Sequence, residues 1–111
     1  MSPTFSDGEL HFFNKNIDLL ENGDIVLIKM QNSKIVKRIA AVENDEIEIL
    51  NSELFINGVY ICEAHECSNV KYKLKKNTFF VLGDNLQNSE DSRKIGVINE
   101  ENIIGELVKY N

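Results

Sequence analysis

Two strand-like segments joined by a short polar connection decide the fold of this 111-residue chain. The first is Asp24-Ile25-Val26-Leu27-Ile28-Lys29-Met30, and the second is Ile35-Val36-Lys37-Arg38-Ile39-Ala40-Ala41-Val42. Both are rich in β-branched and apolar residues, which favour strands, and the four residues between them have the composition of a hairpin connection. The sequence therefore predicts that the two segments pair antiparallel.

Most of the remaining chain also has the pattern of short strands. Residues 46–50 alternate charged and apolar side chains, as a strand with one wet face does. Asn57-Gly58 predicts a second hairpin between strands at 54–56 and 59–61. Further strands are expected at 70–74, 79–82 and 103–110.

A single short helix is expected, over residues 16–22, with Gly23 where it would end. The length permits one domain, 1–111, with one modest core. We therefore expect a mainly β fold, with antiparallel sheets in a distorted sandwich or barrel.

Charge and hydropathy exclude some classes of protein. The net charge is −6 and the acidic residues are spread along the chain, so nucleic acid is not expected as a partner. No apolar run is long enough to span a bilayer, and the N-terminus lacks the features of a signal peptide, so the chain as given is expected to be soluble. Because Met1-Ser2-Pro3-Thr4 starts abruptly, without a linker or cap, we expect a fragment.

Cys62 and Cys67 are the only cysteines. With His65 between them they could contribute to a zinc site, but a structural site usually takes four ligands, and we assign no metal and no cofactor. A local disulfide in an oxidising compartment is a second interpretation. Two unpaired thiols in a loop is the one we prefer.

A dense polar stretch, Gly83-Asp84-Asn85-Leu86-Gln87-Asn88-Ser89-Glu90-Asp91-Ser92-Arg93, holds more hydrogen-bonding capacity than a turn requires. It either holds a complicated loop together or supports a reactive group from elsewhere. Lys37 is a candidate for that group, because strand alternation places Lys37 and Arg38 on opposite faces, so that one cation points inward. Burial lowers the pKa of a lysine and lets it act as a general base. The alternative is Lys37 on an exposed face, with its stem over apolar neighbours.

Four groups of residues, in their order and spacing, resemble the bacterial type I signal peptidases, which are membrane-bound Ser-Lys endopeptidases. They are Met1-Ser2-Pro3-Thr4-Phe5, Gly23-Asp24-Ile25-Val26, Lys37-Arg38, and the polar stretch that ends in Asn88-Ser89-Glu90-Asp91-Ser92-Arg93. The resemblance implies the antiparallel fold of that family. In that family a serine hydroxyl attacks the peptide carbonyl and a neutral lysine takes its proton.

The resemblance also implies roles for individual residues. Lys37 matches the general base and Ser89 the serine that orients it, while Asp91 and Arg93 match a supporting ion pair and Asp84 a structural carboxylate. The implied substrates are signal peptides of preproteins, cleaved after small residues of the Ala-X-Ala type. They would add as a strand beside that of Lys37. The positions that match the substrate pockets are Met1, Phe5, Ile35 and Val36.

The nucleophile falls outside the given chain. The family pattern is Ser-Met-x-Pro-Thr, and Pro3-Thr4 sets the register so that the serine precedes Met1. Ser2 lies two residues further on, about 6 to 7 Å along an extended backbone. We therefore expect an inactive fragment of an active enzyme, whose N-terminal anchor tethers the catalytic domain to the extracytoplasmic side of the cell membrane.

Other readings, and departures from the family pattern, remain. A natural homologue that lost the chemistry is one alternative, and a pilus-associated module that binds extended peptides without cleaving them is another. A self-cleaving repressor of the related Ser-Lys fold is disfavoured, because no DNA-binding part is present. Residues 40–45 lack the family's Gly and Pro-Gly-Asp. Residues 61–75 are expected to form a short insertion or hairpin, so that the size resembles the compact Gram-positive enzymes.

Overall fold

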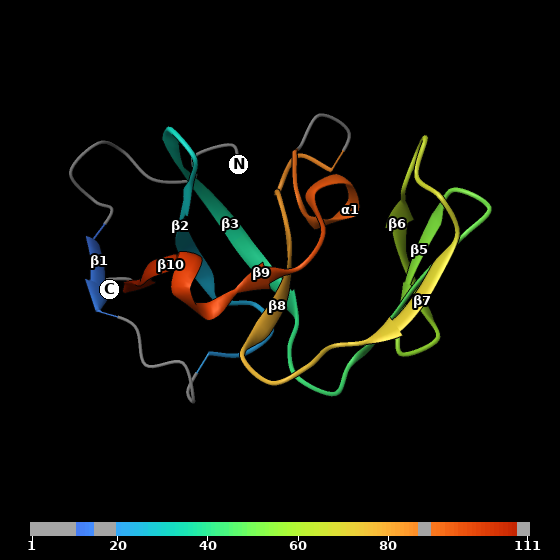
Figure 1. The fold of residues 1–111 in the computed structure, drawn as a ribbon, viewed down its shortest axis with the longest axis horizontal. Coiled ribbons are helices and arrows are strands. Elements are labelled where there is room, and N and C mark those ends of the chain that lie inside the picture. The colour runs from blue at the N-terminus through green and yellow to red at the C-terminus, as the bar shows by residue number, and fades with distance from the viewer. Residues whose placement is uncertain (1–10, 15–19, 87–89, 109–111) are drawn as a thin grey trace.

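The fold is built almost entirely from antiparallel strands, as the sequence predicts. The computed structural model describes residues 11–14, 20–86 and 90–108 (Figure 1). In spatial order, the strands of a six-stranded sheet are β1 (His11–Asn14), β10 (Ile103–Val108), β2 (Ile25–Met30), β3 (Ser33–Ala41), β8 (Thr78–Leu82) and β9 (Ile98–Asn99). Those of a four-stranded sheet are β6 (Val59–Glu63), β5 (Glu53–Ile56), β4 (Glu46–Leu50) and β7 (Val70–Lys73).

Both predicted hairpins are present. β2 and β3 pair antiparallel from Ile25 opposite Arg38 to Met30 opposite Ser33, which leaves a two-residue turn, shorter than the connection expected from the sequence. β5 and β6 are joined by Asn57 and Gly58, whose φ angles are 52° and 80°. Positive φ at both positions is what the tight turns of two-residue hairpins require, and Asn-Gly adopts it most readily.

A bulge in β3 lets this strand contribute to two cores. Ile39 lies opposite Val81 of β8, but Ala41 lies opposite Phe80, so Ala40 is an extra residue on β3. Such a residue interrupts the alternation of side chains. Ile39 therefore packs in the core of the six-stranded sheet, while Ala41 packs in the core that covers the four-stranded sheet.

Strand β8 lies where the two cores meet (Figure 1). Phe79 and Val81 pack into the core of the six-stranded sheet, and Phe80 and Leu82 into the other core. All four side chains are buried, which explains why this strand is a continuous apolar run rather than an alternating one.

The predicted helix over residues 16–22 is not found in its described part. Residues 15–19 lie outside the described ranges, and residues 20–22 form an irregular segment and a turn. The carboxylate of Asp24 accepts a hydrogen bond from the Glu21 backbone N–H at 2.9 Å. The Asp24 N–H donates to the Glu21 carbonyl at 3.1 Å. These bonds close a local turn that competes with helix formation.

Residues 61–75 do not form a hairpin. β6 and β7 lie at opposite edges of the four-stranded sheet, so this segment crosses from one edge to the other. Their partners are instead β5 and β4, which occupy the middle of the sheet.

Several short elements were not predicted. They are β1, β9, the four-residue helix α1 (Ser92–Ile95) and a 3-10 turn at Glu100–Asn102. In the described ranges, no helix is long and apolar enough to cross a bilayer.

Phe80 provides a test of the two-core arrangement. It is fully buried, and Phe80→Ala is expected to lower the free energy of unfolding by about 3 to 5 kcal/mol, through lost burial and the cavity left behind. Val59→Ala is the control, because Val59 on the edge strand β6 is 62% exposed and its loss should change stability by no more than about 0.5 kcal/mol. Urea unfolding followed by circular dichroism measures both, and equal effects would contradict the assignment of the core.

Candidate active site

Lys37 is buried in the middle of β3, opposite Val26 of β2, with only 5% of its surface exposed. Arg38, the next residue, is partly exposed, as expected for neighbouring residues on opposite faces of a strand. Burial lowers the pKa of Lys37, and the nearby carboxylates of Asp91 and Glu90 partly oppose that effect. A lysine in this environment loses its proton more readily than one on the surface.

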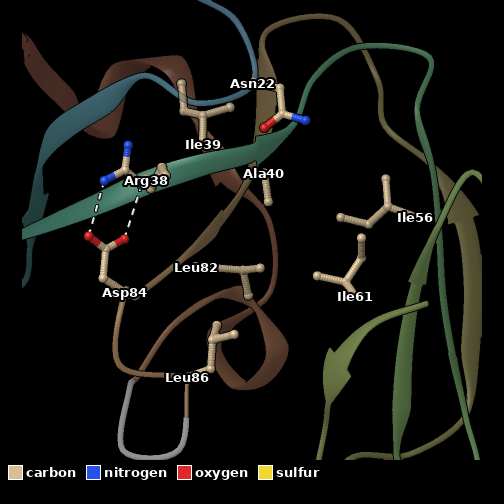
Figure 2. Close-up of a pocket in the computed structure, with 10 residues that line it drawn as sticks. Asn22, Arg38, Ile39, Ala40, Ile56, Ile61, Leu82, Asp84 and Leu86 are labelled. Carbon is tan, nitrogen blue, oxygen red and sulfur yellow. Dashed lines mark hydrogen bonds and ion pairs between the residues drawn. The ribbon is translucent and has the colours of Figure 1, made fainter. Parts of the chain in front are cut away.

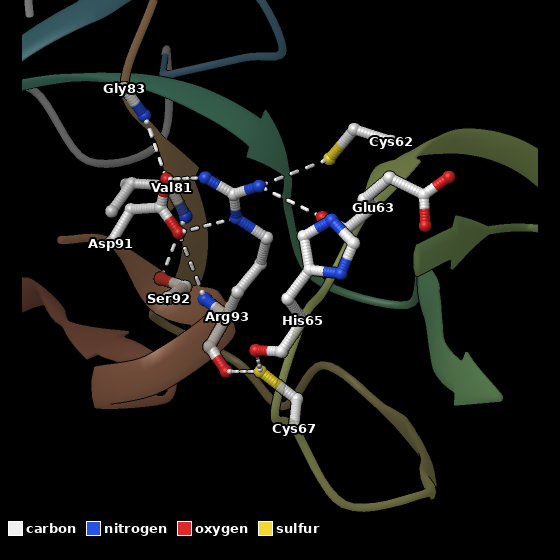
Figure 3. Close-up of polar contacts among 9 residues, drawn as sticks. All are labelled: Cys62, Glu63, His65, Cys67, Val81, Gly83, Asp91, Ser92 and Arg93. Carbon is white, nitrogen blue, oxygen red and sulfur yellow. Dashed lines mark hydrogen bonds and ion pairs between the residues drawn. The ribbon is translucent and has the colours of Figure 1, made fainter. Parts of the chain in front are cut away.

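Asp91 is the centre of the polar loop that faces Lys37. Its side chain has no exposed surface, and it accepts hydrogen bonds from the Gly83 and Arg93 backbone N–H groups, both at 3.1 Å (Figure 3). It also forms a two-pronged ion pair with Arg93, with Nε at 2.9 Å and Nη2 at 2.8 Å. The expected ion pair is therefore present. Burial alone would raise the pKa of Asp91, but the bonds from Arg93 and Gly83 outweigh it and hold that pKa below its ordinary value.

Arg93 connects this loop to the four-stranded sheet. Its Nη1 donates to the Glu63 carbonyl at 2.9 Å and lies 3.6 Å from the Cys62 sulfur. The Cys67 thiol donates to the Arg93 carbonyl at 3.1 Å. Both cysteines are free thiols, and no group of three or more His, Cys, Asp or Glu side chains in the described part of the chain is placed to hold a metal. The cysteines thus contact the polar loop, which their spacing did not reveal.

Ser92 links the loop to β8 through a hydrogen bond. Its buried hydroxyl accepts a hydrogen bond from the Val81 backbone N–H at 2.9 Å. β9 pairs with β8 only at Thr78 and Phe79, so the hydroxyl takes the place of a strand partner further along this edge. The sequence analysis assigned no role to Ser92, although its position between Asp91 and Arg93 could have indicated one.

Asp84 lies apart from this cluster, in a second ion pair. Its two oxygens accept from Arg38 Nε at 3.0 Å and Nη2 at 3.1 Å (Figure 2). Arg38 Nη1 also donates to the Gly23 carbonyl at 3.0 Å. The pair borders a cavity of about 300 Å³ whose walls include Leu82 and Leu86. Asp84 was expected as a structural carboxylate, but its partner was not predicted.

The expected pocket residues are placed only in part. Ile35 and Val36 are half-buried and, as neighbours on β3, point to opposite faces. β8 pairs with β3 only from Arg38 onward, so among the described residues no strand covers this edge of β3 at positions 33–37. Met1, Phe5 and Ser89 lie outside the described residues.

Comparison with known proteins gives the family. The family model described as "Signal peptidase, peptidase S26" matches residues 1–110, and the chain belongs to this family. Signal peptidase I of Bacillus amyloliquefaciens is 38% identical over 126 aligned positions, and signal peptidase I T of Bacillus subtilis (strain 168) is 36% identical over the same length. Each match covers 95% of this chain and 65% of the relative, so the chain spans a little less than two thirds of these proteins.

The fold agrees with that assignment. The crystal structure of a signal peptidase I from Enterococcus faecalis V583 matches with a TM-score of 0.62 at 21% identity, and the match covers 86% of this chain and all of that chain. The predicted family and the predicted type of β fold are therefore confirmed.

The two ion pairs are expected to differ in their effect on stability. Asp91→Asn leaves Arg93 without its counter-charge, and only 9% of the Arg93 side chain is exposed. The substitution should therefore lower the free energy of unfolding, measured by urea titration, by about 3 kcal/mol or more. Asp84→Asn is the matched control, because the side chains of Arg38 and Asp84 are 40% and 26% exposed. This substitution should lower the free energy of unfolding by less than about 1 kcal/mol.

The pH dependence gives a second measurement on the same variants. The folded-state pKa of Asp91 is lowered, so its contribution to stability is present above the ordinary Asp pKa of about 3.9 and is lost as the pH falls through the lower folded value. Urea unfolding between pH 7 and pH 2 should show this loss in the wild type, and a weaker loss in Asp91→Asn. Identical pH profiles would contradict the role given to Asp91.

Proposed function

We propose that this chain is the catalytic domain of a Ser-Lys endopeptidase that removes signal peptides from preproteins. The observation that carries the proposal is a lysine almost fully buried in a strand, near a polar loop whose buried Asp91 is paired with Arg93. Membership of the signal peptidase family supports the substrate class. The domain would act on the extracytoplasmic side of the cell membrane, held there by an N-terminal anchor.

In the proposed reaction, neutral Lys37 takes the proton of a serine hydroxyl as the serine oxygen attacks the carbonyl of the scissile bond. The Lys37 ammonium then gives that proton to the leaving amine, so that the peptide C–N bond breaks and an acyl-serine remains. A water molecule, deprotonated by Lys37, then attacks the ester carbonyl. The ester C–O bond breaks, the Lys37 ammonium returns the proton to the serine oxygen, and the signal peptide is released. The serine is the residue immediately before Met1, and Ser89 orients the Lys37 amine.

Arg93 limits the effect of the loop carboxylates on Lys37. An isolated carboxylate beside Lys37 would hold it protonated, because an opposite charge nearby favours the charged form. Asp91 and Glu90 raise the pKa of Lys37, but Asp91 is paired with Arg93, which lowers that pKa, and burial outweighs both carboxylates. Removal of Arg93 would leave Asp91 facing Lys37 and oppose its action as a base.

The substrate is proposed to bind as an added strand along the edge of β3 at positions 33–37. Backbone hydrogen bonds would align it, and side-chain pockets would select residues. Ile35 and Val36 project from opposite faces of that edge and would contact different sides of the bound peptide. Together with Met1 and Phe5 they would restrict the cleaved sequence to small residues of the Ala-X-Ala type.

A second candidate function shares this edge. A module that holds extended peptides without cleaving them would need the uncovered strand edge but no general base. Burial of Lys37 favours the peptidase, because burying a cation is costly and a module that only binds peptides has no need of a buried lysine.

The test uses the chain extended at its N-terminus by the residues of its own gene, with a fluorogenic Ala-X-Ala peptide. Lys37→Ala is expected to lower kcat/KM by about three orders of magnitude, the effect of losing a positioned base. Lys29→Ala, an exposed lysine on β2, is the control and should have no effect. Full activity in Lys37→Ala would rule out the assigned base.

The same assay tests the nucleophile and the pH dependence. The 111 residues alone should bind the peptide but not cleave it, and cleavage by them would contradict a serine before Met1.

Because burial lowers the pKa of Lys37, activity in the extended chain should rise with pH through a value below 10.5, where the lysine becomes neutral. Binding without cleavage by the extended chain would favour the non-catalytic module.

A further inference from the structure

The backbone carbonyl of Arg93 has an unusual partner. α1 has only four residues, and the last carbonyls of a helix have no partner within it. In the described part of the chain the Arg93 carbonyl is reached by the Cys67 thiol, at 3.1 Å. The same sulfur lies 3.6 Å from the His65 carbonyl, but a thiol has one proton, and the shorter distance favours Arg93.

Cys67 is itself held in place by a turn. Its backbone N–H donates to the Ala64 carbonyl at 3.2 Å, and Glu63, just before the turn, accepts from the Arg93 guanidinium. The turn therefore contacts Arg93 at two points, one on the side chain and one on the backbone (Figure 3).

A cavity of about 500 Å³ borders this contact. Cys67 and Tyr72 line it from the side of the four-stranded sheet, and Arg93, Lys94 and Gly96 from the side of α1. α1 thus has open space beside it and could shift unless it were fixed. The Cys67 bond is the contact that fixes its backbone from this side.

We propose that Cys67 is a positioning residue for the peptidase reaction, whose thiol fixes the backbone of Arg93 and thereby holds the paired Asp91 carboxylate in its place near Lys37. This inference rests on the proposed function, because a positioning role needs a reaction. Asp91 and Arg93 act on Lys37 with opposite signs, so a small shift of one relative to the other changes the balance of charge around the base.

The kinetic test uses the extended chain. Cys67→Ala removes the donor and is expected to lower kcat about tenfold with KM unchanged, as the loss of a group that orients a catalytic residue does. Cys67→Ser keeps a donor in the same place and should stay within about threefold of the wild type. Ser68→Ala, the neighbouring residue on the same cavity, is the control and should have no effect. Wild-type kcat in Cys67→Ala, or equal losses in the Ala and Ser variants, would overturn the proposal.

A measurement that needs no activity separates the two proposals. In NMR spectra of the 111 residues, the Arg93 Nε–H should be protected from exchange in the wild type and in Cys67→Ser, and should exchange at least about tenfold faster in Cys67→Ala. If the NMR result holds but the extended wild type cleaves nothing, the proposed function fails and the positioning role fails with it. If cleavage depends on Lys37 but Cys67→Ala matches the wild type in both measurements, only the inference about Cys67 is wrong.

Discussion

The buried ion pair between Asp91 and Arg93 is the interaction on which the site depends. Transfer of two charges from water to a protein interior is costly, and their mutual attraction offsets this cost only when further hydrogen bonds satisfy the remaining polar atoms. Here the Gly83 N–H, just after β8, and the Glu63 carbonyl, at the end of β6, supply such bonds. The pair is therefore stabilised where the two sheets meet, because its hydrogen-bond partners come from both of them. The described residues contain no buried side-chain nitrogen or oxygen without a partner.

Lys37 depends on the same arrangement through the backbone. β3 carries it on one face of the six-stranded sheet, and the bulge at Ala40 lets the same strand turn Ala41 toward the other core. β8, packed on both sides, runs alongside β3 and leads directly into Gly83 and the polar loop. One strand thus supplies Lys37, the proposed base, and its neighbour leads into the loop whose charges act on it.

The sequence predicts the parts of this arrangement that are local. Alternation placed Lys37 and Arg38 on opposite faces, Asn57-Gly58 predicted its hairpin, and the family resemblance implied the ion pair between Asp91 and Arg93. The contacts of Arg93 with Glu63 and Cys67 were not predicted, because they join residues 26 or more positions apart and have no periodic pattern. The ion pair between Arg38 and Asp84 was not predicted for the same reason, since these residues are 46 positions apart. The helix expected over residues 16–22 is absent in its described part, residues 20–22, where the Asp24 side chain competes for the local backbone.

The link from Arg93 back to β6 has a consequence for the order of events during synthesis. A chain emerges from its N-terminus, and contacts between distant segments form late, because the intervening loop must first be closed. Lys37 is made early, yet the residues that set its surroundings come from the last quarter of the chain and reach back to residues 62–67. The emerging strand therefore carries an ordinary solvated lysine, and the lysine reaches its final electrostatic surroundings only when nearly the whole domain is in place.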